Sequence, residues 1–482
     1  MSAEITFALD SMPLSVDFSW PVDYDGRLIG EALVRTLLTE GAVGSGAAHS
    51  PRAYDDGRRW RVTLDTSLTW SDGVPLEASH AERAVRRIAR KPGSWLASLL
   101  SKKEGEEPVT VVDRETVEYR FEHPTSFADG FFTLPQLAPL RPGSGKLNGP
   151  SLGDFTFTSA LPDRIVLSRR RDRSERWPQG PGKLGFQHYP SLQKALDAYA
   201  EGLVDISSAT SFGIPEATRF AGHPNLLKRN ISIFGSIEFG DRVNAVTGAV
   251  RRVVGAAVDR DRIVDGCAGL VAPYWSQTAP WCDAYELPAD LAAASHAPTR
   301  REVEDVRRVL GETVDFAYAD FSPNQTVVGL VREQLRETFG IDAVLRPLSY
   351  QDYVKAVIKR DYGLLYTLTA AEFPHPAALL ATWRSDRPAA VHSGFADPVL
   401  DRLIDEASVQ TDPLRAPRFW QDADRRWLDR MPRVPLVQVR AHCVHSQRVT
   451  RLSLNSTGLV DFSGLALSSQ STDLTATERY ST

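Results

Sequence analysis

The strongest constraint on the fold is an alternation of strand and helix patterns in the second half of the chain. Strand patterns occupy residues 314–318 and 343–348, and a helical period fills residues 327–339 between them. This order favours an α/β unit in which helices cover both faces of a sheet. Another strand pattern, residues 364–368, is followed by residues 371–376, which lie where open α/β sheets bind ligands.

The first third of the chain has a different pattern. A strand pattern over residues 4–9 ends at a break over residues 11–13, and residues 30–38 carry apolar side chains at helical spacing. Between residues 51 and 142, strand patterns surround a single helix over residues 77–89. We therefore expect a compact subdomain that is inserted into a larger lobe.

Charge, hydropathy and the first residues limit the partners and the location. The chain has 56 Lys and Arg against 61 Asp and Glu, so its net charge of -5 offers no broad positive field and nucleic acid is not an expected partner. No apolar run reaches about 18 residues, so direct membrane insertion is not expected. The first residues lack the features of a secretory signal. The chain is thus expected in the cell envelope if it is a processed chain, and in the cytoplasm if Met1 is its native start.

The three cysteines leave the redox compartment open. Cys267 and Cys282 flank a loop that one disulfide could close, and the chain-entropy model gives such a closure about 3 kcal/mol. The alternative is two buried free thiols. Cys443 lies in a strand pattern and is expected to be a small core residue.

Motifs for phosphate, metal or nucleophile chemistry do not occur in the sequence. Residues 143–146 read Gly-Ser-Gly-Lys but lack the spacing of a phosphate-binding loop. Neither a G-x-S-x-G nor an H-E-x-x-H motif is present. His442 and His445 are three apart in a strand pattern and should point to opposite faces. We expect no catalytic residue, no metal and no cofactor.

Residues 68–78 carry the most specific motif of the chain, which reads Leu-Thr-Trp-Ser-Asp-Gly-Val-Pro-Leu-Glu-Ala and leads into a helix. It resembles the W-S-D-G-x-P-x-x-A signature of the family 5 solute-binding proteins of bacterial ABC importers, which include the oligopeptide-, dipeptide- and nickel-binding types. Four further blocks are similar to family motifs in the same order, namely residues 112–117, 195–206, 250–264 and 395–404. The resemblance runs from about residue 4 to about residue 465.

The resemblance implies an α/β, periplasmic-binding-protein-like fold with two lobes, of type II and of the large cluster with an extra inserted subdomain. Lobe I would comprise residues 1–35, 148–238 and 455–482, the inserted subdomain residues 36–147, and lobe II residues 239–454. The implied function is capture of a peptide or other small amine-bearing solute in the interlobe cleft. The protein would be a monomer that closes about a hinge and delivers its ligand to the permease of an ABC transporter.

Two other functions stay open beside this one. A cytoplasmic protein of the same fold could have been co-opted as an enzyme or carrier in a biosynthetic pathway. A ligand-sensing domain is the other alternative.

The resemblance also implies ligand-binding residues in lobe II. Residues 371–376 read Ala-Glu-Phe-Pro-His-Pro where peptide-binding members have A-D-Y-x-x-P, whose aspartate pairs with the ligand's α-ammonium. Glu372 therefore inherits that role, and Phe373 lies beside it. The alternative for Glu372 is an internally paired or solvated carboxylate. Tyr350 aligns with an aromatic residue that lines the cleft in many members, or is a packed surface aromatic, and Thr369 falls where many peptide binders have tryptophan.

Three residues of lobe I complete the predicted site. Tyr24 matches a stretch that lines the pocket in the family, and Ser11 and Met12 directly follow the first strand pattern. We expect these three side chains to face the cleft from the opposite lobe.

Overall fold

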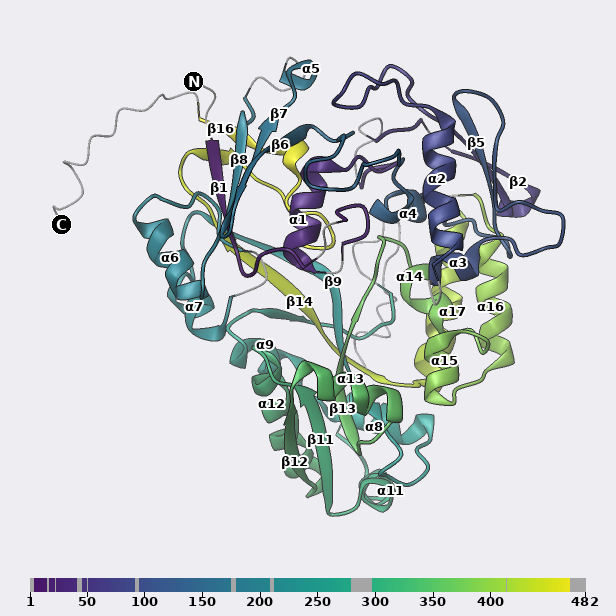
Figure 1. The fold of residues 1–482 in the computed structure, drawn as a ribbon. Coiled ribbons are helices and arrows are strands. Elements are labelled where there is room, and N and C mark those ends of the chain that lie inside the picture. The colour runs from purple at the N-terminus through teal and green to yellow at the C-terminus, as the bar shows by residue number, and fades with distance from the viewer. Residues whose placement is uncertain are drawn as a thin grey trace.

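The structure is a computed structural model that describes residues 4–468 except 15–16, 22, 41–45, 50, 92–94, 175–178, 209–211, 279–296 and 413. Three sheets with their helices form three parts of the molecule, which Figure 1 shows at upper left, upper right and bottom. Within the described residues, no helix is long and apolar enough to cross a membrane.

The first sheet contains both the start of the chain and a middle segment. Its strand order is β1 (Glu4–Leu9), β8 (Lys183–His188), β7 (Arg164–Arg169) and β6 (Phe155–Leu161). Strands β1 and β8 are parallel, and the other pairs are antiparallel. The helices of this part are α1 (Tyr24–Leu33), α5 (Arg171–Ser174), α6 (Leu192–Ala200) and α7 (Ile214–Arg219). The core on this sheet joins Ile5 and Phe7 to Leu454 and Phe462, so the two ends of the described chain share one core.

The second sheet belongs to the segment in which the sequence analysis expected an inserted subdomain. It is antiparallel, with the order β2 (Arg52–Tyr54), β3 (Arg59–Thr63), β5 (Thr116–Arg120) and β4 (Val109–Val111). Its own helices are α2 (Ala78–Ala89), α3 (Trp95–Leu99) and α4 (Ala128–Phe132). The W-S-D-G motif forms a tight turn here, where Trp70 is buried and Gly73 has a φ of 86° that suits only glycine.

Helices from late in the chain pack onto this second part. They are α14 (Ala377–Leu380), α15 (Pro388–Ser393), α16 (Pro398–Ser408) and α17 (Ala416–Arg430). Trp420 and Trp427 share a core cluster with Trp60 and Phe132, and Figure 1 shows α16 and α17 beside α2 and α3. Residues 377–430, which the sequence analysis grouped with the rest of 239–454, therefore bury their apolar faces against residues 60–134.

The third sheet contains the strand–helix–strand unit that the sequence predicts. Its strand order is β10 (Val271–Pro273), β14 (Val434–Val444), β9 (Leu226–Phe239), β13 (Leu364–Ala370), β11 (Thr313–Ala319) and β12 (Asp342–Leu348). Strands β11 and β12 are parallel and are linked by α12 (Asn324–Phe339). The other helices are α8 (Gly248–Ala257), α9 (Arg260–Gly266), α11 (Arg300–Leu310) and α13 (Tyr350–Lys359). Val254 and Val327 cover one face of the sheet, and Val357 of α13 covers the other.

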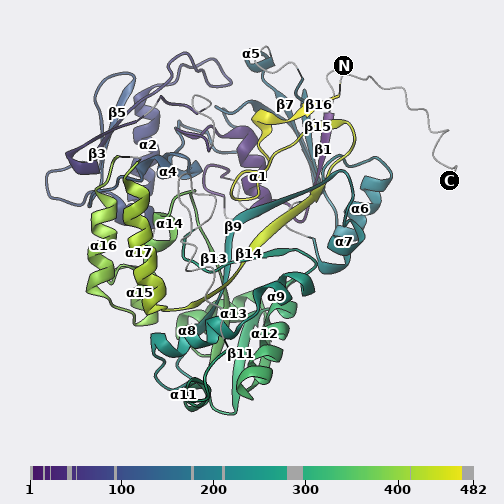
Figure 2. The ribbon, with the colours of Figure 1, turned by 180° about the vertical axis from the view of Figure 1, so that it is seen from behind.

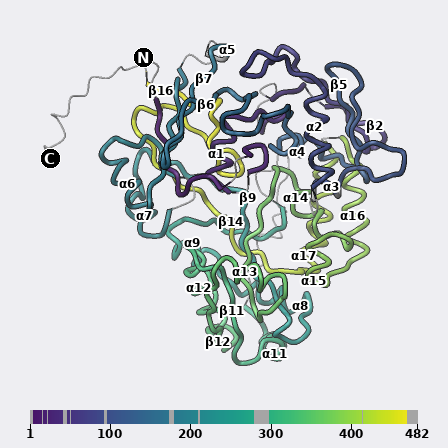
Figure 3. Tube along the Cα trace, in the orientation of Figure 1, coloured from purple at the N-terminus to yellow at the C-terminus, as the bar shows by residue number. Residues whose placement is uncertain are grey.

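Strands β9 and β14 connect the first and third parts, as Figures 2 and 3 show. They pair antiparallel along most of their length, with register shifts between Pro435 and Val437 and between Gln438 and Arg440. Cys443 at one end of the pair lies in the core of the first sheet, and Val434 at the other end lies in the core of the third. This two-stranded connection gives the molecule its two-lobed form.

A short hairpin and one crossing segment complete the arrangement. Strands β15 (Val449–Arg451) and β16 (Ala466–Leu467) form a small antiparallel sheet. After β13, the chain leaves the third sheet and runs to α14 beside the second sheet (Figure 3). Residues 371–376, where the sequence analysis expected ligand binding, form this crossing segment.

Candidate functional site

A cavity of about 670 Å³ lies where helix α1, strand β9 and the crossing segment after β13 meet. Residues from both ends of the chain line it, including residues 27–40 and 451–463, together with residues 133–135 and 153–155. Arg229 from β9 and Glu372 from the crossing segment contribute two further charged side chains. The cavity therefore lies between the first and second parts of the molecule, and the crossing segment after β13 and one end of β9 complete its lining.

A larger hollow, of about 920 Å³, lies among α8, α11 and α17. All of its lining residues fall between 244 and 435, so residues of the first sheet take no part in it. Solute-binding sites in two-lobed folds form between the lobes. We therefore regard the smaller, shared cavity as the candidate site.

Charged side chains dominate the lining of this cavity. Its four arginines are Arg27, Arg35, Arg229 and Arg451, and its five carboxylates are Glu31, Glu40, Asp154, Glu372 and Asp461. Arg35 Nη2 lies 2.6 Å from Asp154 Oδ1, and Arg229 Nη2 lies 3.6 Å from Glu40 Oε1. Such a lining suits a small polar or charged solute and not an apolar one.

Glu372 lines the cavity but already has a cationic partner. Its Oε2 lies 2.8 Å from Nη2 of Arg27, which belongs to α1. The preceding residue continues the pairing of β13 with β9, since the Ala371 amide donates to the Ser232 carbonyl over 2.7 Å. Of the two arrangements that the sequence analysis left open, this is the internally paired carboxylate, and its role toward a ligand stays a prediction.

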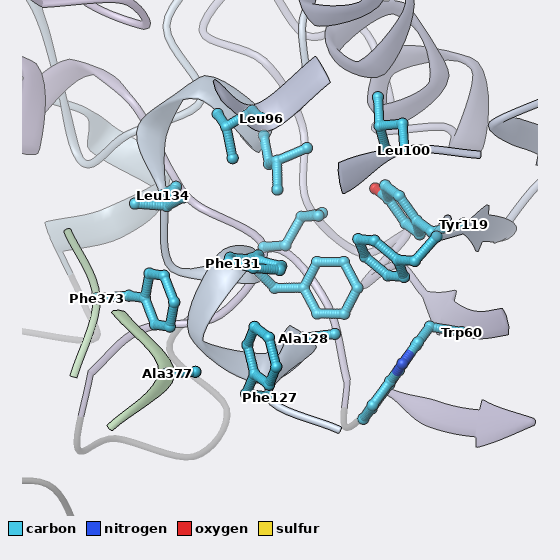
Figure 4. Packing of buried hydrophobic residues seen from close by; sticks show 14 of the residues in the cluster. Trp60, Leu96, Leu100, Tyr119, Phe127, Ala128, Phe131, Leu134, Phe373 and Ala377 are labelled. Atoms are coloured by element: carbon cyan, nitrogen blue, oxygen red, sulfur yellow. The ribbon is translucent and has the colours of Figure 1, made fainter. Parts of the chain in front are cut away.

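Phe373 packs into an aromatic core, as Figure 4 shows, and does not line the cavity. Its ring meets the ring of Phe131 edge-on at a centroid distance of 4.8 Å and stacks on Phe127 at 6.3 Å. Only 3% of Phe373 is exposed. An added Cβ at Gly130 would lie 2.4 Å from this ring, so the packing leaves no space for a ligand there.

Thr369 and Tyr350 lie near the end of strand β13 and at the start of helix α13. The Thr369 hydroxyl, at the end of β13, accepts a hydrogen bond of 2.7 Å from Nη1 of the buried Arg433. Tyr350 is the first residue of α13 and is 71% exposed, with its ring stacked on Tyr353 at 6.5 Å. Neither side chain lines the cavity.

The three predicted residues of the first lobe lie together near the start of α1. The Tyr24 hydroxyl donates to the Gly458 carbonyl over 2.8 Å, and burial raises the pKa of Tyr24 well above its usual value. The Ser11 amide donates to Oδ2 of Asp25 over 2.8 Å, and burial raises the pKa of that carboxyl to about 6. Met12 is half-buried against the core of the first sheet. Of the seven predicted residues, only Glu372 lines the cavity.

The sequence analysis missed the other charged residues of the cavity. Arg27 and Glu31 are four apart on a helix, a spacing that usually marks a solvated ion pair on a surface. Arg229 and Asp461 lie in segments without any recognisable motif. Only the tertiary arrangement brings them together.

Metal binding finds no support in the described part of the chain, which contains no group of three or more His, Cys, Asp and Glu side chains suited to hold an ion. Cys267 and Cys443 are buried free thiols, and burial raises the pKa of each to about 12. Cys282 lies outside the described residues.

Comparison with known families gives one match, which covers most of the chain. Residues 42–390 match the family described as bacterial extracellular solute-binding proteins, family 5 Middle. A search of curated proteins by sequence finds no match.

Solved structures of binding proteins share the fold over nearly the whole length. The murein tripeptide binding protein MppA of Escherichia coli is 15% identical, with 97% of this chain and 98% of that chain covered and a TM-score of 0.75. OppA of Haemophilus influenzae in complex with RPPGFSPFR is 16% identical, with 97% and 99% covered and a TM-score of 0.75. AgaA of A. tumefaciens R10 in complex with agropinic acid is 17% identical, with 97% and 99% covered and a TM-score of 0.74. These likenesses establish the two-lobed fold.

Proposed function

The chain belongs to the family 5 bacterial extracellular solute-binding proteins, and we propose that it captures a peptide or another small amine-bearing solute between its lobes for an ABC importer. The observation that carries this proposal is the charged cavity of about 670 Å³, which the first part, the second part and the crossing segment after β13 line together. Ligand pockets commonly measure about 300–1,000 Å³. The cavity therefore suits a solute of the size of a short peptide or an amino-acid derivative.

The ligands of the structural neighbours support this class of solute. The neighbours named above include a murein tripeptide binding protein, a protein bound to the peptide RPPGFSPFR and a protein bound to agropinic acid. A lining of arginines and carboxylates offers partners for both charged ends of such molecules.

The proposal extends to location, partners and division into lobes. We place the protein outside the cytoplasmic membrane, as a monomer without catalytic activity that docks on a permease. Residues 1–35, 148–238 and 455–482 would form lobe I, residues 36–147 the inserted subdomain and residues 239–454 lobe II. Closure would bend the connection through β9 and β14, where the register of the two strands shifts.

A thermal-shift screen followed by calorimetric titration tests the proposed function. The purified protein is screened against short peptides, amino acids, opine-type derivatives, sugars and metal chelates. A cognate solute at a hundred times its Kd should add about 2.7 kcal/mol of stability and raise the melting temperature. Binding should also give a negative heat-capacity change. If only sugars or metal chelates shifted the melting temperature, or if nothing did, the proposal would be wrong.

A further inference from the structure

Glu31 differs from most other charged residues of the cavity because it has no partner among the residues that the structure describes. Arg27, Arg35 and Arg229 are each within ion-pair distance of a carboxylate, namely Glu372, Asp154 and Glu40. The Arg451 guanidinium donates to the Gly464 carbonyl. Among the described residues, no hydrogen bond or ion pair engages the Glu31 side chain, although it lines the cavity. A carboxylate of this kind leaves an acceptor for a group that comes from outside the protein.

Helix α1 holds Glu31 in a fixed position. Leu28, Ile29, Ala32 and Leu33 are buried on one side of this helix, which directs Glu31 to the open side. The Asp23 carboxylate caps the first turn by accepting from the Gly26 amide over 2.7 Å. The helix backbone also packs closely, since a Cβ at Gly30 would lie 2.9 Å from the Phe18 carbonyl oxygen. The carboxylate thus projects into the cavity from a rigid element.

The charged groups that act on Glu31 are one arginine and two carboxylates. Glu31 is exposed to solvent in the cavity, and the protein atoms packed around it raise the pKa of its carboxyl group to about 7. Asp461 and Glu40 add to the rise, and Arg27, which is bound to Glu372, opposes it. An unpaired carboxylate with like charges beside it is stabilised in its ionised form by an added cation.

We propose that Glu31 is the specificity-determining residue that receives the cationic group of the ligand, an ammonium or a guanidinium, while Glu372 stays bound to Arg27. This inference rests on the proposed function and names the residue by which an amine-bearing solute would be recognised. Glu40 and Asp461 would strengthen the attraction from neighbouring positions. A neutral solute that displaced water from Glu31 would leave its carboxylate without a partner.

Three peptide probes test whether the cation that Glu31 receives is an α-ammonium or a side-chain ammonium. Tri-alanine carries an α-ammonium, acetyl-Ala-Lys-Ala carries only a side-chain ammonium, and acetyl-tri-alanine carries none. Calorimetric titration measures the Kd of each probe for the wild type, Glu31→Gln and Glu372→Gln. We expect Glu31→Gln to weaken the better of the two cationic probes at least about tenfold, because it removes the charge from a desolvated pair. Glu372→Gln should weaken that Kd less than Glu31→Gln does, because Arg27 already holds the Glu372 carboxylate.

The pH dependence of the Kd is a second test of the inference. It would not change in Glu31→Gln if Glu31 only stabilised the fold. A cation favours the ionised carboxylate, so a pKa near 7 predicts that wild-type affinity for acetyl-Ala-Lys-Ala, whose side-chain ammonium stays charged, rises about tenfold between pH 6 and pH 8 and that binding at pH 7 releases protons. Arg27, Glu40 and Asp461 are the charged groups that influence Glu31, and they are unchanged in Glu31→Gln. Glu31→Gln should therefore lose the pH dependence of the Kd.

The outcomes separate this inference from the proposed function. If the wild type binds a cationic probe and Glu31→Gln binds it equally well with the same pH dependence, the inference is wrong and the proposed function stands. If Glu372→Gln is the variant that loses affinity, the inference is also wrong. If no probe binds the wild type, the amine-bearing ligand class is wrong and the inference falls with it.

Discussion

Nη2 of Arg27 lies 2.8 Å from Oε2 of Glu372, and this ion pair joins helix α1 to the crossing segment after β13. The two residues are 345 positions apart in the chain. Because Arg27 belongs to the first part of the molecule and Glu372 follows the third sheet, the pair spans the cavity wall from one part to the other. The carboxylate that the family resemblance assigned to a ligand cation is thus neutralised by the protein itself.

The first prediction concerns the strength of this ion pair. Arg27→Gln, Glu372→Gln and the double variant should give a coupling energy of about 0.5–1 kcal/mol, because the two side chains are 29% and 36% exposed and solvent screens their attraction. Urea unfolding of the four proteins measures it. The matched control is Arg300 with Glu304, which pair on the surface of α11 and should couple more weakly. A coupling energy of zero for Arg27 and Glu372 would contradict the prediction.

Phe373 is expected to affect stability and not ligand binding. Phe373→Leu should lower the free energy of unfolding by about 1–2 kcal/mol, since the smaller side chain loses its ring contacts with Phe127 and Phe131. Denaturant unfolding measures the loss, and calorimetry with a cognate solute should give an unchanged Kd. Phe321→Leu is the control, because Phe321 is 47% exposed and should change stability little. A weaker Kd without a loss of stability would place Phe373 in the ligand site.

Arg433 supports the end of strand β13 through a buried charge. Its Nη1 donates to Thr369 over 2.7 Å and lies 3.5 Å from Oε1 of Glu238, and its guanidinium lies 5.3 Å from the Trp383 ring centroid. Arg433→Met should cost about 3 kcal/mol of stability, because it leaves the largely buried Glu238 carboxylate without its cation.

Thr369→Val gives the matched comparison for this prediction. It removes only a neutral acceptor from Arg433 and should cost about 1 kcal/mol. Chemical denaturation of both variants measures the two losses. Equal losses would show that Arg433 stabilises the fold through its hydrogen bond to Thr369 and not through the charge of Glu238.

Local patterns predicted the regular parts of the fold well. Residues 313–319, 324–339 and 342–348 form the strand, helix and strand that the periodicity indicated, because each element buries one face within a unit that is continuous in sequence. Local patterns could not predict which part of the chain residues 377–430 pack against. An amphipathic helix shows that it has a buried face, but its periodicity does not identify the sheet that covers it.

The candidate site was harder to predict for two physical reasons. Glu372 and Phe373 are neighbours in sequence, yet one lines the cavity and the other fills an aromatic core, because the chain bends at these residues. Arg27 and Glu31 face the cavity only because the end of the chain, residues 451–463, folds back over α1. No local pattern reports such a long-range contact.

The last prediction is a pH dependence of stability that arises from His375. Its ring lies between Phe127, at a centroid distance of 5.5 Å, and Trp420, at 5.4 Å, and its Nδ1 accepts a hydrogen bond of 3.1 Å from the Ala377 amide. Burial lowers the pKa of His375 to about 3, because the charged imidazolium would lose its hydration between these rings. The folded protein therefore holds a neutral imidazole at pH values where the unfolded chain would bind a proton.

The sign of the effect follows from this difference. The unfolded chain takes up a proton below a pKa of about 6.5 and the folded protein does not, so the contribution of His375 to stability is complete above pH 6.5 and declines as the pH falls toward 3. At pH 5 the loss is about 2 kcal/mol at most, because the ring keeps some contact with solvent. Burial of Asp25 and Asp129 raises the pKa of each to about 6, so these carboxyls act in the opposite direction.

A variant without the imidazole isolates the effect. His375→Asn keeps a side-chain acceptor for the Ala377 amide but does not titrate, and it retains Asp25 and Asp129, whose effects cancel in the comparison. Urea unfolding at a series of pH values from 7.5 to 5 gives the free energy of unfolding of both proteins. The wild type should lose up to about 2 kcal/mol more than the variant over this range. Parallel curves would show that the His375 imidazole can be protonated in the folded protein, in contradiction to its burial between Phe127 and Trp420.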